Sequence, residues 1–374
     1  MIEPRPRSIA SLAAVVVPFL LSGCAAEAPP PAPAEPGPRL VLVDSVTLAD
    51  TGRLALGDLA NAGLHVDDAS IWVGDPQNGR VVRFARDGSP VAQVGRKGSG
   101  PGELQAPGPL VPIGNGRVAV WDYRLGKLAA YGAADGALAW ETAVREQAFP
   151  VQLQSVGDTV WAGAVSLREM TGAMRVTAGE GTVGHVGAVP AEYAQGLAHA
   201  FPYSVALRGD DGLLVGYSGH HRMFVHHDDG RVDSIPVPSR LRRGVPPDLL
   251  ARAMAGEYRE AGLGMENFVS SLHRAARTAN GALALVHYDV TFDQSAPNEP
   301  AAVDAWLTVL DPALERACTD ARIPLAERSL PSLAFRGDTL YALEQVVGDE
   351  GATPVLRAYL MSTDGCEWME VGRG

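Results

Sequence analysis

The chain has 374 residues, of which 46% are hydrophobic and 20% charged, and its formal net charge is −12. The hydrophobic content is sufficient for a large core, whereas the acidic balance argues against nucleic acid or an anionic membrane surface as a partner, since both favour basic patches. Beyond the N-terminal region no apolar stretch is long enough to span a membrane as a helix.

Residues 1–23 have the pattern of a lipoprotein signal peptide. Arg5 and Arg7 precede the apolar run Ile9–Leu21, which is too short to span a bilayer as a lone helix. The run ends in Leu-Ser-Gly-Cys24, which resembles the bacterial lipobox and implies that Cys24 is the lipid attachment site. Several acyl chains on one residue give a stable anchor. The alternative is an ordinary secretory peptide with a chance cysteine.

Residues 24–39 are rich in proline and alanine without an apolar period, which predicts a disordered, extended tether. Residues 40–374 are predicted to form one domain. Ala25 follows the cysteine, which resembles lipoproteins sent to the outer membrane. We therefore expect an extracytoplasmic monomer that touches the membrane through its lipid anchor only, at the outer membrane or on a leaflet that faces the periplasm.

A repeated phrase organises this domain. Asp75-x3-Gly79-Arg80-x3-Phe84 returns as Asp122-x3-Gly126-Lys127-x3-Tyr131. A recurring unit of four short strands indicates an all-β fold, a β-propeller of four-stranded antiparallel blades. The isolated alternating segment Leu40–Leu48 is expected to join the last blade and close the ring. Six blades are expected, at about 59–94, 108–144, 150–189, 203–237, 273–325 and from about 337 to Glu370.

The extra length of the chain falls on one side of the predicted disc. The turns between first and second strands are short, whereas the connections between blades and those between second and third strands are long, which predicts one loop-rich face. The expected long loops are 96–107, 190–202, 239–272, 166–172, 291–301 and 347–353. The insertion between blades four and five contains a predicted helix, Pro247–Ala261, because Pro247 suits a helix start and Leu250, Met254 and Tyr258 recur every fourth residue. This helix either packs on the rim or covers the channel.

The segment Gly95–Leu104, preceded by the Asp75–Phe84 hairpin, resembles the signature of bacterial six-bladed β-propeller lipoproteins, relatives of NHL-repeat and lactonase-type propellers. The resemblance covers blades one and two well and the others thinly. It implies the fold and little chemistry. Lactonase-like relatives hold calcium, for which Asp75, Asn78, Asp122, Asp289 and Asp293 are candidate ligands, although a turn hydrogen bond explains the repeated aspartates more simply. NHL-type lyases use histidines around zinc, and His65, His199 and His273 are weak candidates for such a site.

The sequence contains no nucleophile elbow, HExxH motif or phosphate-binding loop. No cofactor is therefore predicted, calcium or zinc being the alternatives. Aromatic residues at matching strand positions are expected to pack between blades: Trp72, Trp121, Trp161, Trp306 and Tyr341. The candidate binding face consists of Arg96, Lys97, Arg168, Asp289, Asp293 and Tyr258.

An oxidising compartment permits a disulfide between Cys318 and Cys366. If the two cysteines occupy equivalent positions in adjacent blades, however, they lie too far apart to pair, so the pairing stays open.

These patterns favour a non-enzymatic binding module for a protein, peptide or envelope glycan, with the ligand on the loop-rich face. The alternative is a metal-dependent hydrolase or lyase of the lactonase or NHL-lyase type with its site at the channel mouth. A structural spacer without a ligand is a third hypothesis.

Overall fold

The computed structural model describes residues 37–49, 52–59, 62–144, 148–177, 183–191, 193–194, 203–210, 212–257, 270–293, 296–326, 331–348 and 351–372. Contacts divide the chain into Met1–Glu35 and Pro36–Gly374, and the described strands all belong to the second unit. The predicted signal peptide, Cys24 and nearly all of the predicted tether lie outside the described residues. Among the residues that are described, no helix has both the length and the apolar character needed to cross a membrane.

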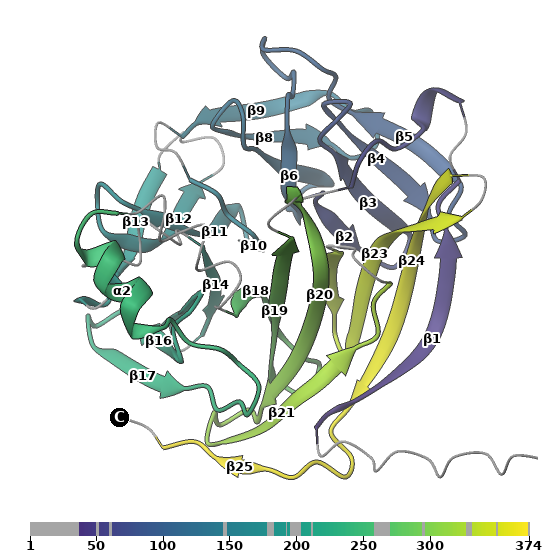
Figure 1. The fold of residues 1–374 in the computed structure, drawn as a ribbon. Helices are drawn as coiled ribbons and strands as arrows, with labels where there is room; N and C mark the ends of the chain where they lie inside the picture. Colours follow the sequence, from purple (N-terminus) through teal and green to yellow (C-terminus); the bar gives the residue numbers. More distant parts are fainter. Residues whose placement is uncertain are drawn as a thin grey trace, which may run out of the picture. The chain divides into compact units, whose positions relative to one another are not determined.

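Six antiparallel sheets follow one another around a ring, which confirms the predicted six-bladed β-propeller (Figure 1). Blade one consists of β2 (Leu64–Val66), β3 (Ser70–Asp75), β4 (Arg80–Ala85) and β5 (Pro90–Val94). Blade two consists of β6 (Pro107–Ile113), β7 (Arg117–Asp122), β8 (Lys127–Gly132) and β9 (Leu138–Ala143). Blade three consists of β10 (Leu153–Val156), β11 (Thr159–Ser166), β12 (Thr171–Thr177) and β13 (Val183–Ala188). Blade four consists of β14 (Ser204–Gly209), β15 (Gly212–Tyr217), β16 (Arg222–His226) and β17 (Val232–Pro236). Blade five consists of β18 (Ser271–Arg277), β19 (Leu283–Asp293), β20 (Ala296–Leu310), β21 (Arg316–Ile323) and β25 (Met369–Glu370). Blade six consists of β22 (Ser332–Arg336), β23 (Thr339–Gly348), β24 (Gly351–Ser362) and β1 (Arg39–Thr47). A short 3-10 helix, η1 (Gly52–Leu54), precedes blade one.

The N-terminal strand closes the ring, as its sequence predicts. β1 pairs antiparallel with β24 from Arg39↔Ser362 to Thr47↔Val355 and so forms the outermost strand of blade six. The packing begins slightly earlier than expected, because Gly37 and Pro38 are already buried. A Cβ on Gly37 would lie 2.6 Å from the Thr319 carbonyl oxygen of β21, so only glycine fits there.

The connections between blades are long, as expected, but two of the predicted loops within blades are strands. In blade five, β19 and β20 extend across much of 291–301, and in blade six β23 and β24 extend across much of 347–353. The extra residues therefore lengthen two hairpins, which are visible in Figure 1 as the long green and yellow ribbons.

The insertion between blades four and five contains α2 (Pro247–Met254). The helix begins at the predicted proline and ends before the predicted Ala261, and residues 258–261 lie outside the described ranges. Pro247, Asp248, Ala251 and Arg252 are exposed. Asp248 in the first turn and Arg252 in the last turn oppose the charges of the helix dipole.

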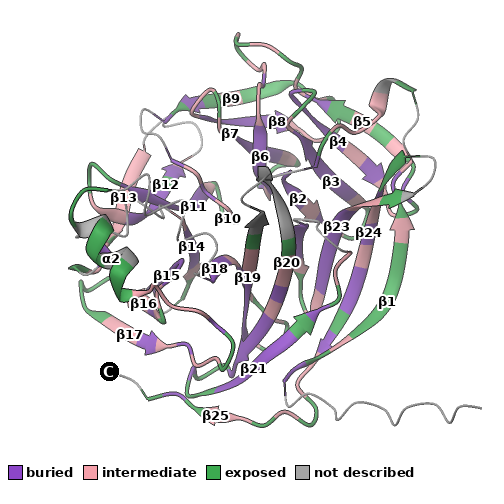
Figure 2. Ribbon diagram, viewed as in Figure 1, coloured by how far each residue is buried: buried purple, intermediate pink, exposed green. Residues whose placement is uncertain are grey.

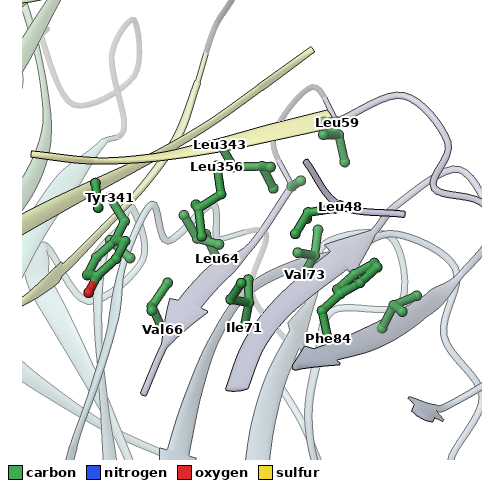
Figure 3. Packing of buried hydrophobic residues seen from close by; sticks show 14 residues of the cluster. Leu48, Leu59, Leu64, Val66, Ile71, Val73, Phe84, Tyr341, Leu343 and Leu356 are labelled. Atoms are coloured by element: carbon green, nitrogen blue, oxygen red, sulfur yellow. The ribbon is translucent and has the colours of Figure 1, made fainter. Parts of the chain in front are cut away.

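The core lies between neighbouring blades. The inner strands are buried and the outermost strands β1 and β9 are largely exposed (Figure 2). Figure 3 shows one such layer, where Leu64, Val66 and Ile71 of blade one pack against Tyr341 and Leu343 of blade six. The predicted packing role of the aromatic residues is confirmed for Trp72, Trp121, Trp161 and Tyr341, which belong to the buried clusters. Trp306 differs, because it is half-buried and its indole Nε1 donates to Asp289 (3.1 Å).

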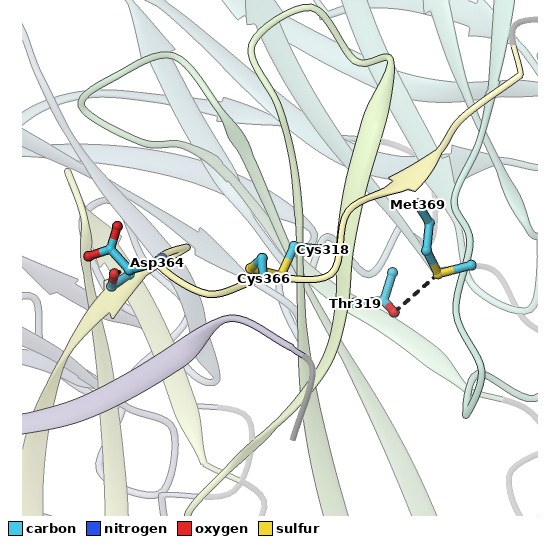
Figure 4. The surroundings of a disulfide bond; sticks show 6 residues. Cys318, Thr319, Asp364, Cys366 and Met369 are labelled. Atoms are coloured by element: carbon cyan, nitrogen blue, oxygen red, sulfur yellow. Dashed lines mark hydrogen bonds between the residues drawn. A yellow bond between two sulfur atoms is a disulfide. The ribbon is translucent and has the colours of Figure 1, made fainter. Parts of the chain in front are cut away.

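A disulfide joins Cys318 of β21 to Cys366, with a Cα–Cα distance of 5.8 Å (Figure 4). The expected separation of these cysteines by a full blade is wrong. Because β1 occupies the outer position of blade six, the chain after β24 crosses to blade five, where β25 pairs with β21. Cys366 lies on this crossing segment and reaches Cys318 directly. Blade six therefore ends at β24 and not at Glu370.

Candidate functional site in the central channel

A small cavity lies between the innermost strands of five of the six blades. β2, β6, β10, β14, β18 and β22 form a closed ring in which each strand contacts the next. Inside the ring lies a volume of about 110 Å³, which we call the central cavity and which corresponds to roughly three or four water molecules. More of its exposed wall surface is polar than apolar, although, apart from His65, Gln152 and Arg274, the residues that line it have apolar side chains: Leu64, Pro109, Leu110, Val111, Leu153, Ala275, Ala276, Leu333, Ala334 and Phe335.

Arg274 is the charged group of this wall. It is only 7% exposed. Its Nε donates to the Leu333 carbonyl of β22 (2.9 Å) and its Nη1 to the His273 carbonyl (3.2 Å). Burial lowers the pKa of this guanidinium, and the nearby phenols of Tyr288 and Tyr123 raise it by a smaller amount. No carboxylate among the described residues forms an ion pair with it.

A β-bulge places this arginine and its neighbour on the inner strand. In the pairing of β18 with β19, Leu272 lies opposite His287 and Arg274 opposite Val286, so His273 is an extra residue. Such a bulge re-aims the side chains beside it. The His273 ring lies against Tyr288 with centroids 4.5 Å apart, and burial lowers the pKa of His273 well below its usual value. His273 is therefore neutral at pH 7.

The other two polar residues of the wall are neutral as well. The Gln152 side-chain amide donates to the Ala275 carbonyl (2.7 Å) and accepts from the Ala275 amide (2.9 Å), which joins blade three to blade five. Burial lowers the pKa of His65 to about 4. Arg274 is thus the one residue of the cavity wall that is charged at pH 7.

The predicted metal ligands serve other purposes where the structure describes them. Among the described residues no group of three or more His, Cys, Asp or Glu side chains could hold a metal ion. His65 and His273 lie on β2 and β18, which are separated by β22, and His199 lies outside the described ranges. Calcium and zinc remain predictions for the chain as a whole.

Asp75 and Asp122 hold the loops that lead into the inner strands. Asp75 is fully buried, accepts from the Gly57 and Asn78 amides (3.3 and 3.1 Å) and pairs with Arg80 Nε (3.1 Å). The Asn78 side chain also donates to Asp75 (2.9 Å). Asp122 accepts from the amides of Gln105 and Ala106 (2.6 and 3.2 Å) and, in an Asx turn, from those of Arg124 and Leu125 (2.9 and 2.8 Å). The simpler sequence interpretation, a repeated turn hydrogen bond, agrees with these contacts.

Asp289 likewise holds a loop in place, here at the base of the insertion between blades four and five. It accepts from Ser270 Oγ (2.5 Å) and Trp306 Nε1 (3.1 Å) and pairs with Arg243 Nη2 (3.3 Å). Ser270 and Arg243 also exchange hydrogen bonds across the base of the insertion, because Ser270 N donates to the Arg243 carbonyl and Arg243 N to Ser270 Oγ. These contacts fix both ends of the segment that contains α2.

Three of the other predicted binding residues, Arg96, Lys97 and Arg168, lie in separate loops and have contacts of their own. Arg96 pairs with Glu103 (2.8 Å), Lys97 Nζ donates to the Gln77 carbonyl (3.0 Å), and Arg168 pairs with Glu169 (3.4 Å). Arg96 and Arg168 are both highly exposed. Asp293 ends β19, where its side chain is not among those described, and Tyr258 lies outside the described ranges.

The sequence pointed to His273 but missed Arg274 beside it. The signal that could have found it is the charge of Arg274 in the segment Ser-Leu-His-Arg-Ala-Ala, because the residues of an innermost strand are otherwise mostly apolar or small. Strict alternation sends adjacent residues to opposite faces, so the bulge at His273, which changes the facing of Arg274, could not be inferred.

The fold and its centre define the chain as a six-bladed β-propeller with a buried cationic group at the central cavity. It is similar to a DUF4221 family member from Bacteroides vulgatus, with a TM-score of 0.61 and 11% identity over 87% of this chain and 99% of that one. A candidate exported protein from Bacteroides fragilis gives a TM-score of 0.57 and 12% identity over 87% and 96%. A virginiamycin B lyase from Staphylococcus aureus gives 0.49 and 14% over 85% and 99%. No known protein family and no curated protein matches the sequence. At these identities the likeness shows the fold alone.

Proposed function

We propose that this protein is an extracytoplasmic, lipid-anchored β-propeller that acts as a non-enzymatic binding module for a protein, peptide or envelope glycan. The observation that carries the binding proposal is the central cavity, which is lined mainly by residues with apolar side chains and contains one charged group. Such a combination, a few polar groups in a mostly apolar concave site, is typical of ligand-binding sites.

The size of the cavity favours a ligand that inserts only one group. Sites that enclose a whole drug-sized molecule measure roughly 300–1,000 Å³, whereas the central cavity measures about 110 Å³. A side chain, a chain terminus or a substituent of a sugar fits this space, and the rest of such a ligand would lie on a face of the disc. The loop-rich face offers exposed side chains for these outer contacts, such as Arg168.

Photocrosslinking from two positions of blade three tests which face binds. Arg168 lies between β11 and β12 on the loop-rich face, and its side chain is 79% exposed. Val156 is 47% exposed and ends β10 at the opposite face. We expect a photoreactive residue at position 168 to give a discrete adduct in intact cells, and the same residue at position 156 to give none. Equal adduct patterns from both positions, or none from either, would contradict binding on the loop-rich face.

The anchor is tested separately by Cys24→Ala. We expect this substitution to move the protein from the membrane fraction to the soluble extracytoplasmic fraction, because the acyl chains supply the membrane affinity. Ala26→Ser, two residues further on, is the matched control and should leave the protein in the membrane fraction. Unchanged sedimentation of the Cys24→Ala variant would refute the lipid anchor.

A further inference from the structure

The charge of Arg274 has no internal counterpart in the described part of the chain. A guanidinium stays protonated in proteins, and an unpaired buried charge costs several kcal/mol of folding free energy. Around Arg274 the structure supplies two backbone carbonyls and two phenols. The phenols are engaged elsewhere, because Tyr123 Oη donates to the Pro150 carbonyl (2.8 Å) and Tyr288 Oη to the Pro331 carbonyl (3.0 Å).

The guanidinium is also held in one orientation with part of its donor capacity unused. Nε and Nη1 are bonded to carbonyls of two adjacent inner strands, β22 and β18. Nη2 has no hydrogen bond to any described residue, and it is not completely shielded from solvent. Because Arg274 belongs to the wall of the central cavity, a donor with a fixed direction is available to an incoming acceptor.

We propose that the central cavity receives a carboxylate group of the ligand, which forms an ion pair with Arg274. This inference rests on the proposed binding function and specifies its chemistry. One full positive charge matches one carboxylate, and the planar guanidinium suits the planar acceptor. A doubly charged oxyanion would leave one charge uncompensated in a cavity whose wall holds one cation, and a neutral group would leave the arginine unpaired.

The matched probes are acetate and acetamide, which have the same number of heavy atoms and nearly the same shape but differ in charge. We expect acetate labelled with ¹³C to show saturable binding by NMR to the full chain, purified as the Cys24→Ser form, and acetamide to show none. Arg274→Met should weaken acetate binding about tenfold or more, because hydrogen bonds to charged groups contribute roughly 1.5–3 kcal/mol.

Two further variants separate a binding role from a structural one. Arg277→Gln changes an exposed arginine three residues along the same strand and should leave acetate binding intact. Arg274→Lys keeps the positive charge and should retain part of the binding. Without acetate, Arg274→Met should keep or raise the melting temperature, because removal of an unpaired buried charge is neutral or stabilising. Equal binding of acetate by wild type and Arg274→Met, or equal binding of acetamide and acetate, would overturn the proposal.

Competition identifies the source of the carboxylate. Displacement of acetate by trialanine but not by its C-terminal amide would assign the site to a peptide terminus, and displacement by glucuronate would assign it to an acidic glycan. Displacement by neither would overturn the claim that the ligand inserts a carboxylate. Crosslinking from position 168 in that case would still support binding on the loop-rich face, so the two proposals can fail independently.

Discussion

Cys318→Ala is expected to lower the free energy of unfolding by about 2–4 kcal/mol, which is the usual worth of a native disulfide. The bond joins residues 48 positions apart, and the loop-entropy relation gives about 4 kcal/mol for a loop of that length. The bond also holds β25 against β21, where only two residue pairs link the strands. The measurement is urea unfolding of the full chain carrying Cys24→Ala, which removes the third cysteine.

Reduction provides the control for this experiment. Dithiothreitol should lower the stability of the parent chain by the same amount as Cys318→Ala, and it should have no effect on the Cys318→Ala/Cys366→Ala variant. Equal stability of parent and variant, with or without reductant, would mean that the two cysteines do not pair in solution.

The second large effect is expected for Asp75→Ala, at about 3–5 kcal/mol, which is typical of breaking a buried ion pair on one side. The substitution leaves the guanidinium of Arg80, whose side chain is 11% exposed, without its carboxylate. It also removes the acceptor for the amides of Gly57 and Asn78. Unfolding in urea, followed by tryptophan fluorescence, measures the loss.

Asp87→Ala and Asp122→Ala calibrate that result. Asp87 lies in an exposed turn and accepts only from Ser89, so its replacement should have a much smaller effect. Asp122 accepts four backbone amides but has no cation bonded to it in the described structure, so its loss should fall between the other two. A loss for Asp75→Ala no greater than that for Asp87→Ala would show that the repeated aspartate does not hold the blade together.

The sequence predicted the fold because the fold repeats locally. Asp75 and Asp122, with the glycines that follow them, mark the same turn in two blades, and such turns depend on the residues within them. The strand 40–48 could be assigned to ring closure because a propeller leaves one position open for it. The predictions that failed concern features that depend on residues far apart in the sequence. Whether Cys366 meets Cys318 depends on where the chain goes after β24, which no local pattern records.

The candidate site was harder to predict than the fold for the same reason. The inner strands approach one another only after the ring has closed, so the environment of Arg274 comes from Leu333, Tyr123 and Tyr288, which lie far apart in sequence. The sequence analysis assigns Asp289 to the candidate binding face. The structure instead places it beneath the insertion, where Arg243, Ser270 and Trp306 occupy its oxygens.

The closure by β1 also sets the order in which the chain can fold. Arg39, near the first described residue, pairs with Ser362, near the last, so blade six is incomplete until almost the whole chain has been synthesised. Until then β1 has no partner strand and its edge is free, and such edges are where partly folded chains aggregate. Contacts between residues so distant in sequence form slowly. During synthesis the N-terminal strand must therefore remain unpaired until β24 has been made.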